Sequence, residues 1–130
     1  MVPLVKSIRL MLGNTGEELR SSLRAAIRDE PDMELVGEET NPVQMLIRVA
    51  ECNADVILVA AARSEEEPAI VSHLLMEYPS LIAAALDPSG ANACIYSFRV
   101  EHSALKFARH SEFIHALRSY WYQHRLVSRI

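Results

Sequence analysis

A continuous apolar run from Val56 to Ala62 restricts the fold of this 130-residue chain more than any other feature. A strand with one face in water alternates apolar and polar side chains, whereas this run has no polar residue. We therefore expect a central parallel strand that is covered on both faces. Asp55 precedes the run, and we interpret it as a turn or cap residue. A second apolar run, Leu81 to Leu86, stops at Asp87 and predicts a further strand.

Short strands and amphipathic helices alternate over the first two thirds of the chain. Strands are expected at 8–12 and 33–37, and helices after Gly16, after Thr40 and before Tyr78. The side chains expected to face inward are Leu19, Leu23, Ala26 and Ile27 in the first helix, Val43, Leu46, Ile47 and Ala50 in the second, and Ile70, Val71, Leu74 and Leu75 in the third. Because strand-helix-strand crossovers are right-handed, this order predicts a parallel sheet with helices on both faces.

The segment from residue 91 to 109 fits two periodicities. Tyr96, Phe98 and Val100 alternate as in a strand, whereas Cys94, Ile95 and Phe98 would line one side of a helix. We expect a poorly formed helix at 91–101 and then a strand at 104–108, with a β-hairpin as the alternative. A last helix is expected to begin at residues 111–112, and residues 122–130 extend it or form a tail.

The length, hydrophobic fraction and net charge of the chain indicate the class of protein to expect. A chain of 130 residues that is 50% hydrophobic can form one domain with one core, and it has no apolar stretch of membrane-spanning length, so we expect a cytoplasmic protein. The net charge of -4, with both signs interspersed, argues against nucleic-acid binding. Cys52 and Cys94 lack metal-ligand spacing, and so do the five histidines. We expect reduced thiols, no bound metal and no cofactor.

The order and spacing of these elements resemble the receiver domain of bacterial response regulators. The residues that carry the resemblance are Ile8 to Leu12, Leu19 to Arg24, Glu30 to Glu38 and Ala54 to Val59. The resemblance extends over residues 7–119 and is most specific from residue 8 to 60. It implies a three-layer α/β fold of the flavodoxin-like (βα)5 type with a five-stranded parallel sheet. Residues 1–6 would then be an N-terminal lead and residues 120–130 a C-terminal helix extension or tail.

The same resemblance implies that the phosphorylation site of that family is degenerate here. In the family, two carboxylates after the first strand and a third after the third strand hold Mg²⁺, and the third accepts the phosphoryl group. Asn14 and Thr15 occupy the positions of the acid pair, and Ala60 occupies that of the acceptor. Asp87 replaces a hydroxyl residue, and Arg109 lies at the interval of the family's lysine. We expect no metal, no phosphate acceptor and a structural pairing of Asp87 with Arg109.

In receiver domains the fourth helix, fifth strand and fifth helix form the usual dimer and output face, which would correspond to residues 91–122. Tyrosine and tryptophan are common in binding hot spots, although aromatic residues at a helix end can also cover the edge of a core. The residues expected at a partner or dimer interface are Ile95, Phe98, Phe113, Tyr120, Trp121 and Tyr122.

The sequence therefore predicts a pseudo-receiver domain, not an enzyme, that acts in two-component signalling through protein-protein contact. Its partner would be an output or signalling protein, or a second copy in a homodimer. Two alternatives remain open at this point. One is a small-ligand domain or enzyme that reuses the pocket at the carboxyl ends of the strands. The other is a structural dimerisation domain.

Overall fold

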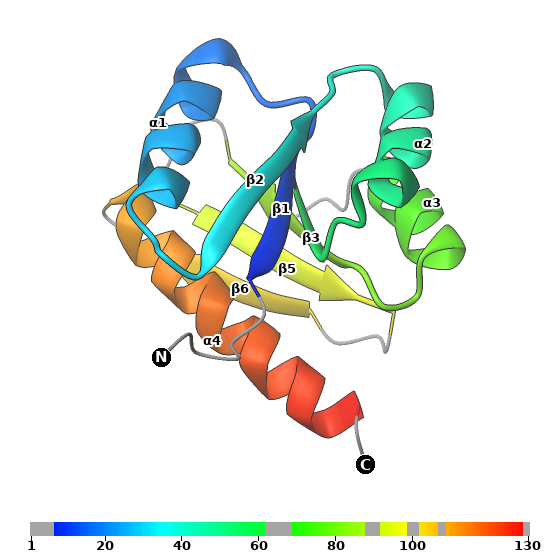
Figure 1. The fold of residues 1–130 in the computed structure, drawn as a ribbon. Coiled ribbons are helices and arrows are strands. Elements are labelled where there is room, and N and C mark those ends of the chain that lie inside the picture. The colour runs from blue at the N-terminus through cyan, green and yellow to red at the C-terminus, as the bar shows by residue number, and fades with distance from the viewer. Residues whose placement is uncertain (1–6, 62–68, 88–91, 99–101, 107–108, 129–130) are drawn as a thin grey trace.

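The apolar run beginning at Val56 forms strand β3 (Val56–Ala60) near the middle of an open six-stranded sheet (Figure 1). The structure is a computed structural model that describes residues 7–61, 69–87, 92–98, 102–106 and 109–128, with the backbone alone at 69, 102–106 and 123–128. The other strands are β1 (Ile8–Leu12), β2 (Met33–Glu38), β4 (Ile82–Leu86), β5 (Asn92–Ser97) and β6 (His102–Lys106). The helices are α1 (Glu17–Arg28), α2 (Pro42–Cys52), α3 (Ala69–Glu77) and α4 (His110–Ser128).

The strands lie in the order β2-β1-β3-β4-β5-β6, and the first four are parallel. The predicted α/β class is confirmed. The prediction of five parallel strands is wrong, because β5 runs antiparallel to β4, and β6 runs antiparallel to β5. The lead predicted at residues 1–6 lies outside the described residues. The boundary predicted at residue 120 falls inside α4.

Helices cover both faces of the sheet and divide the core into two clusters. Helices α1 and α4 lie on one face, and α2 and α3 lie on the other (Figure 1). Side chains alternate between the clusters along β3, because successive residues of a strand point to opposite faces: Val56 and Leu58 belong to the first cluster, and Ile57 and Val59 to the second. All four are fully buried, as predicted for a strand covered on both sides. Among the described residues, no helix has the length and apolar character that a membrane span requires.

The segment after β4 is a β-hairpin, which was the alternative interpretation, and the helix expected at 91–101 is wrong. Strand β5 pairs with all five residues of β4, from Ile82 opposite Ser97 to Leu86 opposite Ala93. Strand β4 pairs with β3 on one side, and all its side chains are buried. Without β5, the backbone N-H and C=O groups on its other side would be buried without hydrogen-bond partners. Pairing with β5 satisfies these groups. The strand expected at 104–108 is β6, which begins two residues earlier; residues 107–108 lie outside the description.

Helix α2 begins as predicted but turns a different face inward. The Asn41 side chain accepts hydrogen bonds from the amides of Val43 and Gln44, and Pro42 occupies the first turn. Met45 and Val49 are the buried residues of the helix. The inner face predicted from the sequence is therefore wrong in part: Leu46 is half-buried, but Ala50 is exposed, Val43 is 65% exposed and Ile47 is 48% exposed. The inner faces predicted for α1 and α3 are confirmed.

Gly13 explains the orientation of Met45. It follows β1, and its amide donates to the carbonyl of Leu58 at 2.7 Å. A Cβ atom at this position would lie 2.7 Å from Met45 Cε and 2.8 Å from Val59 Cγ1, closer than side chains approach one another. The absence of a side chain at Gly13 therefore makes room for Met45 above the end of β1.

Replacing Gly13 with alanine is expected to lower the free energy of unfolding by about 1–3 kcal/mol, because β-branched Val59 cannot rotate away from the added methyl group. Urea unfolding measures the change. Gly16→Ala is the matched control: nothing lies within 4 Å of its Cβ position, so a loss below about 1 kcal/mol is expected. Equal losses in the two variants would contradict the steric explanation.

Candidate functional site

The carboxyl ends of the parallel strands meet at one edge of the sheet, which we name the carboxyl edge. Hydrogen bonds keep the strands together up to this edge: besides the Gly13 amide, the Ala61 amide donates to the Leu86 carbonyl at 2.8 Å. Four of the five residues predicted for the degenerate pocket end these strands or follow them within three residues, namely Asn14, Thr15, Ala60 and Asp87. The fifth, Arg109, immediately precedes α4.

The side chains at the carboxyl edge differ in exposure. Asn14 and Arg109 are exposed, whereas Ala60 and Asp87 are half-buried. Thr15 is only 5% exposed, and its hydroxyl has no hydrogen-bond partner among the described residues. The Asp87 amide donates to the Asn92 carbonyl at 2.9 Å, which joins this residue to the hairpin. The pairing of Asp87 with Arg109 stays a prediction.

An ion-pair cluster beside β2 was not foreseen from the sequence. Arg24 donates from Nε and Nη2 to the two carboxylate oxygens of Glu38, at 3.1 and 2.8 Å. Arg20 lies 3.7 Å from the same carboxylate and donates to the Thr15 carbonyl at 3.0 Å. Hydrogen bonding from Arg24 holds the pKa of Glu38 below its usual value, against the opposing effect of burial. A metal ion would have to displace these charge-assisted bonds to use Glu38.

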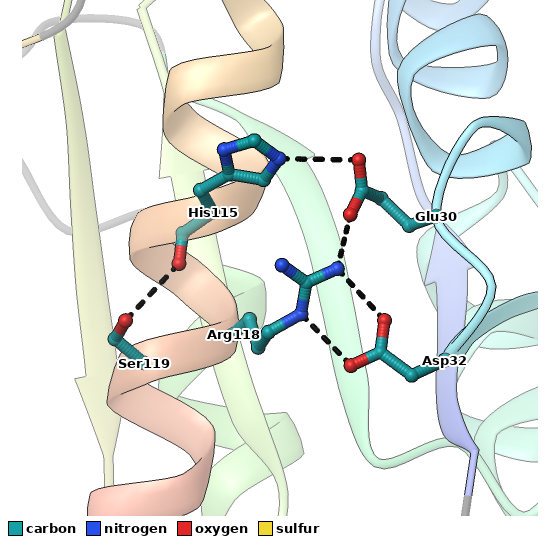
Figure 2. A network of polar contacts seen from close by, with 5 residues as sticks. All are labelled: Glu30, Asp32, His115, Arg118 and Ser119. Atoms are coloured by element: carbon teal, nitrogen blue, oxygen red, sulfur yellow. Dashed lines mark hydrogen bonds and ion pairs between the residues drawn. The ribbon is translucent and has the colours of Figure 1, made fainter.

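A second network ties α4 to the loop between α1 and β2 (Figure 2). Arg118 donates to both carboxylate oxygens of Asp32, from Nε at 2.8 Å and from Nη2 at 2.7 Å. It also donates to Glu30, whose other carboxylate oxygen lies 3.1 Å from Nε2 of His115. Arg118 lowers the pKa of Glu30 and of Asp32 through these hydrogen bonds, while burial opposes the change. The sequence signal was weak, because the partners are more than 80 residues apart.

The six residues predicted for an interface separate into core and surface residues. Ile95 and Phe113 are fully buried and Trp121 is 5% exposed, so these three are core residues and not surface contacts. The reason is the alternation of β5 and the inward stripe of α4, which both point to the sheet core. Phe98 is 51% exposed, and Tyr120 and Tyr122 are half-buried.

Tyr120 connects α4 to the end of the hairpin strand. Its hydroxyl donates to Oγ of Ser97 at 3.4 Å, and Ser97 directly precedes Phe98. Tyr122 instead packs its ring edge-on against Trp121, with ring centres 5.0 Å apart and an interplanar angle of 77°. Phe98, Tyr120 and Tyr122 are therefore the residues of the predicted interface that keep some exposed surface.

The described residues contain no group of three or more His, Cys, Asp or Glu side chains that could hold a metal ion. His110 contacts the Ser22 hydroxyl, and burial lowers the pKa of His110. Cys52 and Cys94 are not joined by a disulfide bond.

The chain matches no protein-family model, no curated protein and no solved structure. The resemblance to a known family therefore depends on the residues of this sequence and on the order of its elements.

Proposed function

We propose that this chain is a pseudo-receiver domain that transmits signals through protein-protein contact without accepting phosphate. The order of the first five strands, β2-β1-β3-β4-β5, with helices on both faces, is that of flavodoxin-like folds and supports the proposal. The antiparallel β5 and the added β6 depart from a (βα)5 domain. They replace a helix and a strand of the family's output face, so the partner is expected to differ from that of an ordinary receiver.

The observation that carries the proposal is the chemistry of the carboxyl edge. A phosphoryl acceptor needs a nucleophilic oxygen, and the residue that ends β3 is Ala60, with a half-buried methyl group. A magnesium site needs several oxygen ligands, but Asn14 and Thr15 follow β1, and Glu38 is already bonded to Arg24. Regulation would then come from association with a partner or from protein abundance.

Phe98 and Tyr120 are the proposed centre of the contact surface. Phe98 is one of the few large apolar side chains that are exposed among the described residues, and aromatic side chains supply much contact area at low entropic cost. The hydrogen bond from Tyr120 to Ser97 ties α4 to the residue that precedes Phe98 in the chain. A homodimer and an output protein are both partners that such a surface could take.

The proposal predicts no response to a phosphoryl mimic. Mg²⁺ with beryllofluoride, added at about millimolar concentration, is expected to leave the amide NMR signals of residues 10–16, 58–61 and 109–113 unchanged, because the acceptor and metal ligands are lacking. A receiver domain with all its acids is the positive control for the reagent.

Saturable shifts at these residues would mean that other groups rebuild the site, and the proposal would be wrong. Shifts caused by an organic ligand but not by beryllofluoride would favour the competing function, a small-ligand site at the carboxyl edge. The buried Thr15 hydroxyl is the observation that would favour that competitor.

A further inference from the structure

An open pocket of about 790 Å³ lies at the opposite end of the sheet, where the parallel strands begin. Pockets of roughly 300–1,000 Å³ are typical of small-molecule sites. Its walls come from both helical layers and from the strand entries. The residues that the argument uses are Arg9, Asp55, Glu77, Tyr78, Pro79 and Trp121.

A guanidinium group of the chain itself binds the C-terminal end of α2, which lines this pocket. Arg9 donates to the carbonyl of Cys52, from Nε at 3.1 Å and from Nη2 at 2.8 Å, and to the Asn53 carbonyl at 3.2 Å. These are the carbonyls at the C-terminal end of the helix, where the helix dipole is negative. One guanidinium of the chain itself therefore already binds at this wall.

The C-terminal end of α3 contributes to another part of the lining. The carbonyl of Leu75 would accept from the amide of residue 79 if the helix continued, but Pro79 has no N-H. Glu77, the last residue of α3, is exposed and lines the pocket. The lining thus combines a formal negative charge with a second negative helix end.

Strand entries and aromatic rings complete the lining. The Asp55 carboxylate accepts a hydrogen bond from the Arg9 amide at 3.0 Å, which fixes it at the start of β3. Tyr78 and Trp121 contribute aromatic side chains, and aromatic faces attract cations. Two acidic residues and the C-terminal ends of two helices therefore line a pocket that has one arginine among its lining residues.

We propose that this pocket binds a small organic cation that carries a guanidinium or amine group. Such a ligand would bind at the C-terminal end of α3 and the Glu77 carboxylate, as Arg9 binds at the end of α2. This site goes beyond the proposed function and lies at the other end of the sheet from the carboxyl edge. Either proposal can therefore fail without the other.

Titration of the full chain with agmatine, a compact guanidinium compound, tests the proposal. Trp121 is the only tryptophan, so its fluorescence reports directly on the pocket. We expect a saturable fluorescence change with amide NMR shifts at residues 53–55 and 77–81. The response should weaken as NaCl is raised from about 0.05 to 0.5 M, and the uncharged urea analogue of agmatine should give none.

Charge-removing variants locate the site. Glu77→Gln is expected to weaken agmatine binding about two- to fivefold, the range for an exposed ion pair. Glu18→Gln removes the same charge in the first turn of α1, at the other end of the sheet, and should leave the affinity unchanged.

Absence of binding, equal responses to agmatine and its urea analogue, or equal losses in the two variants would overturn the proposal. The affinity for blocked arginine amide, compared with that for agmatine, indicates the source of the cation. Equal affinities would indicate an arginine side chain of a partner protein, and weaker binding of the amide would indicate a free small cation.

Discussion

Replacing Phe113 with alanine is expected to lower the free energy of unfolding by about 3–5 kcal/mol, the largest effect among our predictions. Phe113 is the largest of the fully buried side chains and packs in the cluster between the sheet and helices α1 and α4. Its removal leaves a cavity that neighbouring strands, paired on both sides, cannot collapse to fill. Urea unfolding followed by circular dichroism measures the loss.

Phe98→Ala is the matched control for this experiment. Phe98 is 51% exposed, so its truncation should change the unfolding free energy by no more than about 0.5 kcal/mol. If Phe98 contributes to a contact surface, the same variant should weaken self-association or partner binding, measured by analytical ultracentrifugation or titration with the partner. A small loss for Phe113→Ala, comparable to that of Phe98→Ala, would contradict the placement of α4 against the sheet.

Replacing Arg118 with methionine is expected to cost about 1–2 kcal/mol at pH 7. The variant keeps the apolar stem but leaves the Glu30 and Asp32 carboxylates, both mostly buried, without their shared cation. Arg28→Met is the matched control, because Arg28 is an exposed arginine in the last turn of α1. Its expected change lies within about 0.5 kcal/mol.

The same network predicts how stability depends on pH. Arg118 lowers the pKa of Glu30 and Asp32 in the folded protein, so below their ordinary values the unfolded chain binds more protons than the folded one. The stabilisation is complete above the unfolded values, near about pH 4, and is lost as the pH falls through the lower folded values. The wild-type protein should therefore lose more stability than Arg118→Met between about pH 5 and pH 2. Parallel pH profiles would show that the network does not set these pKa values.

Local sequence patterns predicted the structure correctly where the pattern fitted only one type of element. The uninterrupted apolar run at β3, the stripe of α1 and the Asn41-Pro42 start of α2 each have one low-energy structure, and all three are as predicted. Asp55 lies at a bend directly before β3, where a turn or cap residue was expected. Near neighbours in the chain determine these features.

Two predictions failed where the decisive partner is distant in sequence. In α2, apolar residues occur on more than one side of the helix, and the space above Gly13 and Val59 selects Met45 for the core. In the segment after β4, the helix and strand periodicities overlap. This segment forms strand β5 because the buried backbone groups on the open side of β4 need hydrogen-bond partners.

The candidate sites divide in the same way. The apolar residue that ends β3, Ala60, can be read from the sequence because the strand endings are local features. The ion pairs of Arg24 with Glu38 and of Arg118 with Asp32 join residues 14 and 86 positions apart, and the pocket beside Trp121 draws on four separate segments. The sequence alone thus determined the four parallel strands, most helix faces and the residues that end those strands, because short-range patterns encode them. Only the tertiary structure decided the hairpin, the ion-pair networks and the pocket beside Trp121, because each depends on which distant groups the packed chain brings together.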